Sequence, residues 1–320
     1  AASYSDALVH APSYMDAFLA RIRVAKNTGD SNALVDLYTA HADTLDGPNK
    51  QFWIEAAART ASAENAESAD NLYRTAMAGS EGSAASIFRE AAAHFERRGD
   101  LSGVYEARVA EAKTQDGAAR AATLLLVGES IAGEPDRAIA QLTEAFNADP
   151  TCLPAVSLAT DLLVQASRGE GAVGLLEKAI AQEANNSVGG MLRFRLAEVL
   201  EHSMDKPIAA AEAYAAARTA DPELEIAREA EVRCLRRAGQ HQAAVERLRD
   251  AVAETQDSER VTRLLWTIGS ILDRDLERKD EAVEAYRKAA EVSALQPAAI
   301  DGWLQNARGD GSTEDVVDAL

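Results

Sequence analysis

The stretch GEPDRAIAQLTEAFNADP, residues 133–150, contains a complete helix together with the residues that begin and end it. Gly133 opens a turn, and Pro135 follows in the first helical turn, where its missing N–H costs no hydrogen bond. Asp149 and Pro150 then end the helix. One face carries a small, a large and a small residue: Ala138, Leu142 and Ala145. Because so narrow an apolar face buries little surface by itself and lets a second helix approach closely, this helix is expected to stack on neighbours.

The same small, large, small pattern, which we call the seam, recurs along the chain at nearly constant spacing. The eight seams begin at Leu34, Ala69, Val104, Ala138, Ala172, Ala210, Ala244 and Ala282. The separations between these residues are 35, 35, 34, 34, 38, 34 and 38. The first seam departs from the pattern at His41 and the third departs at Arg108 and Glu111. A period near 34 residues predicts a row of equivalent units.

A second helical segment precedes each seam, so each unit is predicted to be a hairpin of two helices. The first three units carry an aromatic residue at a constant offset: Phe18, Trp53 and Phe88. Glycines that would end the first helix of a hairpin stand at Gly29, Gly99, Gly133 and Gly239. The predicted first helices run over 13–27, 49–62, 84–98, 117–131, 154–167, 189–203, 224–238 and 259–275. The predicted second helices run over 31–44, 66–79, 101–114, 135–148, 170–183, 206–220, 241–255 and 279–294.

The chain is expected to consist of an N-terminal extension at 1–12, the repeat array at 13–294, and a capping helix with a tail at 295–320. The segment from Pro297 to Arg308 covers the last apolar face in this interpretation. The alternative is that it begins a ninth unit that is cut short. The sequence starts at Ala1 rather than at Met, which indicates a processed chain or a piece of a longer one.

Composition excludes several classes of protein. Aromatic residues make up 5% of the chain, and 33 basic against 52 acidic residues give a formal net charge of −19. Such a charge disfavours nucleic acid or an anionic membrane as the main partner. No window approaches the roughly 20 apolar residues of a membrane-spanning helix, so no membrane insertion is expected. Cys152 and Cys234 stand too far apart in the sequence for a disulfide or metal pattern, and buried thiols slightly favour a reducing compartment such as the cytoplasm.

The period, the two-helix unit and the seam together resemble the tetratricopeptide repeat (TPR) family. The residues that carry the resemblance are Ala138, Leu142, Ala145 and Pro150; Ala210, Tyr214, Ala217 and Pro222; and Ala282, Tyr286 and Ala289, preceded by Ile268-Gly269. The resemblance implies an all-α protein, a right-handed α-solenoid of about eight hairpins with a C-terminal capping helix. Arrays of the HEAT or armadillo kind are the alternative, but their period is longer than the 34 or 35 residues found at five of the seven steps.

The sequence offers little for catalysis. No HExxH, phosphate-binding GxxxxGK or paired ligand spacing occurs, and the histidines are scattered at His10, His41, His94, His202 and His241. Each histidine is interpreted as a surface or seam residue. The sequence therefore predicts no catalytic residue, no metal and no cofactor.

The TPR resemblance implies that first helices line a concave groove, so their polar residues are the candidate binding site. These candidates are Arg89, Arg97, Phe194, Arg233, Arg236, Arg237, Arg263, Trp266 and Arg274. Most are arginines, which bind carboxylates bidentately. The alternative is that Arg233, Arg236 and Arg237 pair with Glu229, Glu231 and other acidic residues on adjoining helices, and that Trp266 packs between units.

These observations predict a non-catalytic scaffold that binds a protein or peptide segment, an acidic one being a candidate, in its groove. Charge reversal at Arg233, Arg236 and Arg237 is then expected to abolish capture of an acidic partner with folding intact. The alternative function is a self-assembling structural subunit, in which the end near Trp303 binds the Phe18 end of a neighbour.

Overall fold

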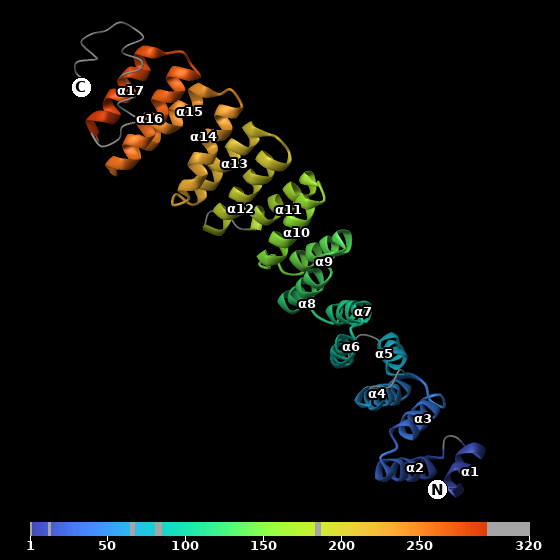
Figure 1. Cartoon of the computed structure of the whole chain (residues 1–320). Helices are drawn as coiled ribbons and strands as arrows, with labels where there is room; N and C mark the ends of the chain where they lie inside the picture. Colours follow the sequence, from blue (N-terminus) through green and yellow to red (C-terminus); the bar gives the residue numbers. More distant parts are fainter. Residues whose placement is uncertain (1, 12–13, 65–67, 81–84, 183–186, 293–320) are drawn as a thin grey trace. The chain divides into compact units, whose positions relative to one another are not determined.

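The computed structural model describes residues 2–11, 14–64, 68–80, 85–182 and 187–292 (Figure 1). The chain divides into two compact units, Ala1–Leu162 and Leu163–Leu320, each of which is described separately below. All regular elements among the described residues are helices, which confirms the predicted all-α fold class. None of these helices is both long enough and apolar enough to span a bilayer. The predicted capping segment and Trp303 lie outside the described residues.

The first unit holds α1 (Ala2–His10), α2 (Met15–Thr28), α3 (Ser31–Ala42), α4 (Gly47–Ala63), α5 (Ser68–Gly79), α6 (Ala85–Arg98), α7 (Leu101–Ala112), α8 (Gly117–Ser130) and α9 (Pro135–Ala148). The division between the units falls within α10 (Leu153–Gln165). The second unit continues with α11 (Gly169–Gln182), α12 (Ser187–Glu198), the π-helical segment η1 (Val199–Ser203), α13 (Pro207–Ala220), α14 (Glu225–Arg237), α15 (His241–Glu254), α16 (Ser258–Arg274) and α17 (Lys279–Val292).

Within each unit the helices pack in chain order, so that hairpins such as α2 with α3 or α16 with α17 stack on their neighbours. All sixteen predicted helices of the array are present. Their ends lie within two residues of the predicted ones if α12 and η1 together are taken as the helix predicted over 189–203. The helix α1 was not predicted, because residues 1–12 were interpreted as an extension. Leu8 of α1 packs against the apolar cluster of α2 and α3, which fixes this helix to the array.

The hairpin turns follow the predicted chemistry with one exception. Gly29, Gly99 and Gly239 have positive φ angles of 67°, 71° and 72°, which end α2, α6 and α14 in the left-handed conformation. Asp30 then caps α3, where its side chain accepts a hydrogen bond from the backbone N–H of Ala33 at 3.0 Å. Gly133 has no positive φ; it lies in a turn before α9, so the prediction of a left-handed residue there was wrong.

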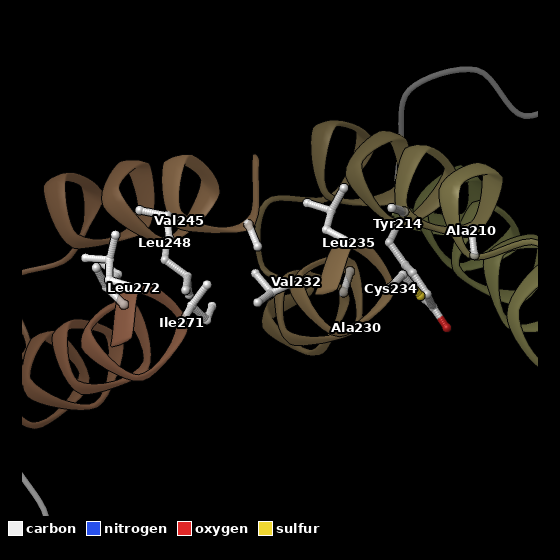
Figure 2. Packing of buried hydrophobic residues seen from close by; sticks show 14 of the residues in the cluster. Ala210, Tyr214, Ala230, Val232, Cys234, Leu235, Val245, Leu248, Ile271 and Leu272 are labelled. Atoms are coloured by element: carbon white, nitrogen blue, oxygen red, sulfur yellow. The ribbon is translucent and has the colours of Figure 1, made fainter. Parts of the chain in front are cut away.

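The predicted seams lie at the buried interfaces between helices in both units. Complete burial is shared by the seam alanines Ala69, Ala138, Ala172, Ala210, Ala244 and Ala282. The large partners four positions later are also buried in seven of the eight seams: Tyr38, Tyr73, Leu142, Leu176, Tyr214, Leu248 and Tyr286. Equivalent burial at this spacing confirms that the hairpins repeat one local packing scheme. Figure 2 shows part of the resulting core in α13 to α16, where Tyr214, Leu248 and Leu272 fill the space between helices.

In three hairpins a large side chain of one helix packs against a glycine of the other. A Cβ added at Gly269 of α16 would lie 2.6 Å from the ring of Tyr286, and a Cβ at Gly128 of α8 would lie 2.5 Å from Leu142. The third repeat reverses this arrangement, because Phe95 of α6 contacts Gly103 of α7.

The reversed pair in the third repeat shifts its seam. The buried residues of α7 are Gly103, Ala107, Glu111 and Ala112, whereas Val104 and Arg108 are only partly buried. The first two predicted positions of this seam, Val104 and Arg108, were therefore off by one residue, whereas the third, Glu111, is buried as predicted. Phe95 supplies the bulk that the second helix provides elsewhere, so the neighbouring positions of α7 must be small.

Candidate binding groove

A cleft of about 710 Å³ lies between α14 and α16 in the second unit. We call it the α14–α16 groove. It is lined by Glu225, Arg228, Glu229, Val232, Arg233, Arg236, His241, Leu248, Arg260, Arg263, Leu264, Thr267 and Asp275. Three predicted site residues, Arg233, Arg236 and Arg263, meet there. Val232, Leu248 and Leu264 supply the apolar part of the lining.

Arg233 is bound to a buried carboxylate. Its Nε lies 2.9 Å from Glu201 Oε1 and its Nη2 lies 2.7 Å from Glu201 Oε2. Glu201 belongs to the η1 segment and is 2% exposed, and the hydroxyl of Tyr214 donates a further hydrogen bond to it at 3.0 Å. These hydrogen bonds, chiefly the one from Arg233, lower the pKa of Glu201 to about 2. Arg233 therefore neutralises a charge in the core, although half of its own side chain faces solvent.

Two groups beside this ion pair have their pKa raised by the same environment. Burial, followed by the nearby negative charge of Glu201, raises the pKa of the Cys234 thiol to about 12. Burial also raises the pKa of Tyr214, whose hydroxyl is hydrogen-bonded to the Glu201 carboxylate. Both groups remain protonated at neutral pH, whereas Glu201 and Arg233 are ionised.

Arg236 and Arg237 of α14 also have acidic partners. Arg236 Nε donates to Asp275 Oδ2 at 2.9 Å, and His241 Nδ1 lies 3.5 Å from the same oxygen. Arg237 forms an ion pair with Asp205, and both side chains are exposed. These three candidate arginines of α14 are therefore paired with acidic residues, as the alternative interpretation of the sequence expected. Their partners are Glu201, Asp275 and Asp205, however, and not the Glu229 or Glu231 that this interpretation named. The expectation that reversing their charge leaves folding intact conflicts with the buried position of Glu201.

Arg263 differs from these three arginines. It is exposed on α16, and its guanidinium has no ion pair or hydrogen bond among the described residues. Arg274 of the same helix is likewise exposed and unpaired within the part of the chain that is described, but it does not line the groove. Glu229 is the corresponding acidic residue of the groove, exposed and unpaired in the described structure.

The remaining predicted residues lie outside the groove. In the first unit, Arg89 Nε donates to Glu111 Oε1 at 2.7 Å, and Arg97 Nη2 donates to Ser62 Oγ at 3.1 Å. In the second unit, Phe194 packs edge-to-face against Tyr214, with the ring centroids 5.2 Å apart. Trp266 packs, partly buried, against the apolar cluster of the same unit. The aromatic candidates thus contribute to the core.

Sequence reasoning missed two arginines of the groove, Arg228 and Arg260. Arg228 is eight residues before Arg236 on α14, and Arg260 is three residues before Arg263 on α16. Both spacings place the missed residue on the same helical face as a predicted one. A search for arginines at helical spacing from each candidate would have found them.

A polar network in the first unit was also missed. His94 is 1% exposed; its Nδ1 lies 2.8 Å from Ser62 Oγ, and its Nε2 lies 2.7 Å from Asp70 Oδ1. The three residues come from α6, α4 and α5, so the network joins three helices. Ser62 is itself buried, and its oxygen already accepts a hydrogen bond from Arg97. The contacts satisfy buried polar atoms, which stabilises the stack.

No group of three or more histidine, cysteine, aspartate or glutamate side chains within the described ranges could hold a metal ion. No family model matches the chain, and no curated protein matches it.

Solved structures do match it. YrrB, described as a TPR protein with an unusual peptide-binding site, is 22% identical, with a TM-score of 0.38 over 57% of this chain and 90% of that one. The C-terminal part of a TPR repeat-containing protein from Cytophaga hutchinsonii is 15% identical, with a TM-score of 0.41 over 78% of this chain and 98% of that one. MamA is 19% identical, with a TM-score of 0.37 over 50% of this chain and 89% of that one.

Identities and TM-scores of this size say nothing about what this chain binds. The class is defined by the chain's own hairpins, with their period of 34 to 38 residues and their buried seams. It is a helical-repeat protein. Its repeats resemble those of the tetratricopeptide family, with a small, large, small seam on the second helix of six of the eight hairpins.

Proposed function

We propose that the protein is a non-catalytic scaffold that binds a peptide or protein segment in the α14–α16 groove. The observation that carries the proposal is Arg263, an exposed guanidinium that has no partner among the described residues and lies beside Leu264 in the groove lining. An arginine in this position can form a bidentate hydrogen-bonded pair with a carboxylate without first breaking an internal ion pair. Val232, Leu248 and Leu264 can receive an apolar side chain of the same segment.

The charges of the groove favour particular segments. Arg263 offers a site for one acidic side chain, whereas the unpaired Glu229 repels a continuous acidic run. The groove therefore favours a segment with an isolated acidic residue beside an aliphatic one. Arg233 and Arg236 contribute to the positive potential, but their nearest carboxylates already hold them in place.

The test uses a random twelve-residue peptide library selected on the whole chain. Peptides that bind are expected to combine an aliphatic residue with aspartate or glutamate. Their affinity is expected to fall about tenfold for Arg263→Gln, the loss of one charged hydrogen-bonded contact. Arg274→Gln is the matched control, because it removes an exposed, unpaired arginine from the same helix outside the groove. Equal affinities for the two variants, or no selected peptide at all, would refute the groove proposal.

Self-assembly is the second candidate function, and one observation favours it. Large apolar side chains are exposed on α1 and around the start of α2: Tyr4, Val9, Tyr14, Met15 and Leu19. Exposed apolar side chains of this size are typical of association surfaces. Phe18 itself is 1% exposed and stacks on His41, so it cannot be the contact residue. Sedimentation over a hundredfold range of concentration tests this candidate, since a chain that stays monomeric does not assemble.

A further inference from the structure

A second, smaller pocket of about 440 Å³ adjoins the α14–α16 groove. We call it the arginine pocket. It is lined by Arg218, Thr219, Pro222, Glu225, Arg228, Glu254, Thr255 and Arg260. Glu225, Arg228 and Arg260 line both the pocket and the groove. A segment bound in the groove can therefore extend one side chain into the arginine pocket.

Three guanidinium groups from three helices converge in this pocket. Arg228 Nη2 donates to Glu254 Oε2 at 2.7 Å, and Arg218 Nη1 lies 3.9 Å from the same oxygen. Arg260 forms an ion pair with Glu225. The hydrogen bond from Arg228, with the charges of Arg218 and Arg260, also lowers the pKa of Glu254. All three cations therefore act on the position that the Glu254 carboxylate occupies.

The pocket has fewer acceptors than its donors require. Its lining holds three arginines against two glutamates. Arg228 is only 7% exposed, and its Nε has no hydrogen-bond acceptor among the described residues. The buried Nε of Arg218 makes no hydrogen bond to the described residues either, and it forms only a long ion pair, at 4.0 Å, with Oε2 of the buried Glu231. Buried donors without acceptors indicate a site at which an additional oxygen ligand would bind favourably.

Such a ligand can displace the Glu254 carboxylate from its ion pair with Arg228. It is the last residue of α15, and more than half of its side chain is exposed. Its carboxylate can therefore turn into solvent at little cost. An incoming oxyanion would then meet guanidinium groups that burial holds in place, with the hydroxyl groups of Thr219 and Thr255 on the same lining.

We propose that the arginine pocket binds the phosphate group of a phosphoserine or phosphothreonine on the segment that occupies the α14–α16 groove. A phosphate monoester carries nearly two negative charges and three acceptor oxygens, which matches three convergent guanidinium groups better than one carboxylate does. Clusters of arginine are a recurrent means of recognising phosphorylated segments. The peptide part of this proposal rests on the proposed function, whereas phosphate binding by the pocket does not.

The first experiment titrates inorganic phosphate into the whole chain by calorimetry. Glu254→Gln removes the internal competitor and is expected to tighten phosphate binding about tenfold, whereas Arg260→Gln is expected to weaken it about tenfold. Arg249→Gln is the matched control, because Arg249 forms a comparable ion pair with Glu281 away from the pocket. Tighter binding by Glu254→Gln cannot arise from misfolding. No phosphate binding, or equal binding by all the variants, would overturn the pocket.

The second experiment compares a nine-residue peptide with a central phosphoserine, flanked by leucines, with its unphosphorylated twin. The phosphopeptide is expected to bind at least tenfold more tightly than inorganic phosphate and than the twin. Its affinity is also expected to fall with Arg260→Gln. If inorganic phosphate binds as tightly as the phosphopeptide, the pocket is a site for the free ion and the segment proposal is wrong. If Arg263→Gln does not weaken the binding of library peptides but inorganic phosphate still binds, the groove proposal is wrong and the phosphate site in the arginine pocket is still supported.

Discussion

Arg233 and Arg263 line the same groove from the first helices of neighbouring hairpins, but they differ in whether they have an acidic partner. Arg233 holds the buried Glu201 with two hydrogen bonds, whereas Arg263 has no partner among the described residues. Both guanidinium groups face solvent, so exposure does not separate them. What separates them is the burial of the partner. A positive charge on a repeat surface is available to a ligand only when no buried carboxylate needs it.

The largest expected difference between the two arginines is in stability. Arg233→Met leaves Glu201 buried without its main partner, which is expected to lower the free energy of unfolding of the second unit by about 3 kcal/mol. Arg263→Met is expected to change it by less than about 0.5 kcal/mol. Hydrogen exchange of the α13 and α14 amides measures both effects. Equal protection in the two variants would contradict the distinction.

Cys234 gives an independent measure of the same difference. Because burial raises the pKa of its thiol to about 12, Cys234 is expected to resist thiol reagents in the folded chain. Arg233→Met should accelerate its labelling by making local opening easier, and Arg263→Met should not. Labelling of the half-buried Cys152 serves as the internal reference.

The next effect is on the pH dependence of stability. The pKa of Glu201 falls from its usual 4.5 to about 2 on folding. The ionised form therefore stabilises the fold fully above about pH 4.5, and this contribution is lost as the pH falls towards about 2. The free energy of unfolding of the wild type should decrease over this interval more steeply than that of Glu201→Gln. Parallel curves would show that Glu201 has an ordinary pKa.

Arg89 tests an intermediate case in the first unit. It binds the buried Glu111, but Arg108 Nη1 also donates to that carboxylate at 2.9 Å. Because a second arginine remains, Arg89→Met is expected to cost about 1 kcal/mol, less than Arg233→Met. Urea unfolding measures the loss. A cost as large as that of Arg233→Met would mean that Arg108 gives Glu111 no support.

Arg237 is expected to show the smallest effect. Its partner Asp205 is 78% exposed, so the ion pair competes with water and salt. Arg237→Met is expected to change the free energy of unfolding by less than about 0.5 kcal/mol in urea unfolding. A larger change would show that the loss in free energy of unfolding does not depend on how deeply the acidic partner is buried.

The fold could be predicted from the sequence because the same weak helix pattern recurs in eight successive hairpins, and the repetition makes it recognisable. The seams that begin at Ala138, Ala210 and Ala282 follow from the periodicity of residues along one helix and from the repeat length. Both can be read from the sequence, so the hairpins could be predicted. The third seam was misplaced because its register depends on Phe95 and Gly103, which exchange the usual large and small positions. The spacing of residues along α7 alone does not reveal that the large residue of this pair lies on α6.

The candidate site was harder to predict for a different reason. The sequence placed Arg233, Arg236 and Arg263 on the correct helices, but it could not show which of them have acidic partners. Glu201 is 32 residues before Arg233, and its burial results from the packing of η1 against α11 and α13. Arg228 could have been found from its spacing to Arg236 on α14, but its burial follows from packing that the sequence does not show.

The most direct test of the account is an amide chemical-shift titration of the isotope-labelled chain with a peptide selected from the library. The account predicts that the largest shifts fall on α14 and α16, around Val232, Arg263 and Leu264, and that they vanish in Arg263→Gln. Shifts that map to the first unit, or that persist unchanged in Arg263→Gln, would contradict the claim that the unpaired arginine of the groove is the one that binds.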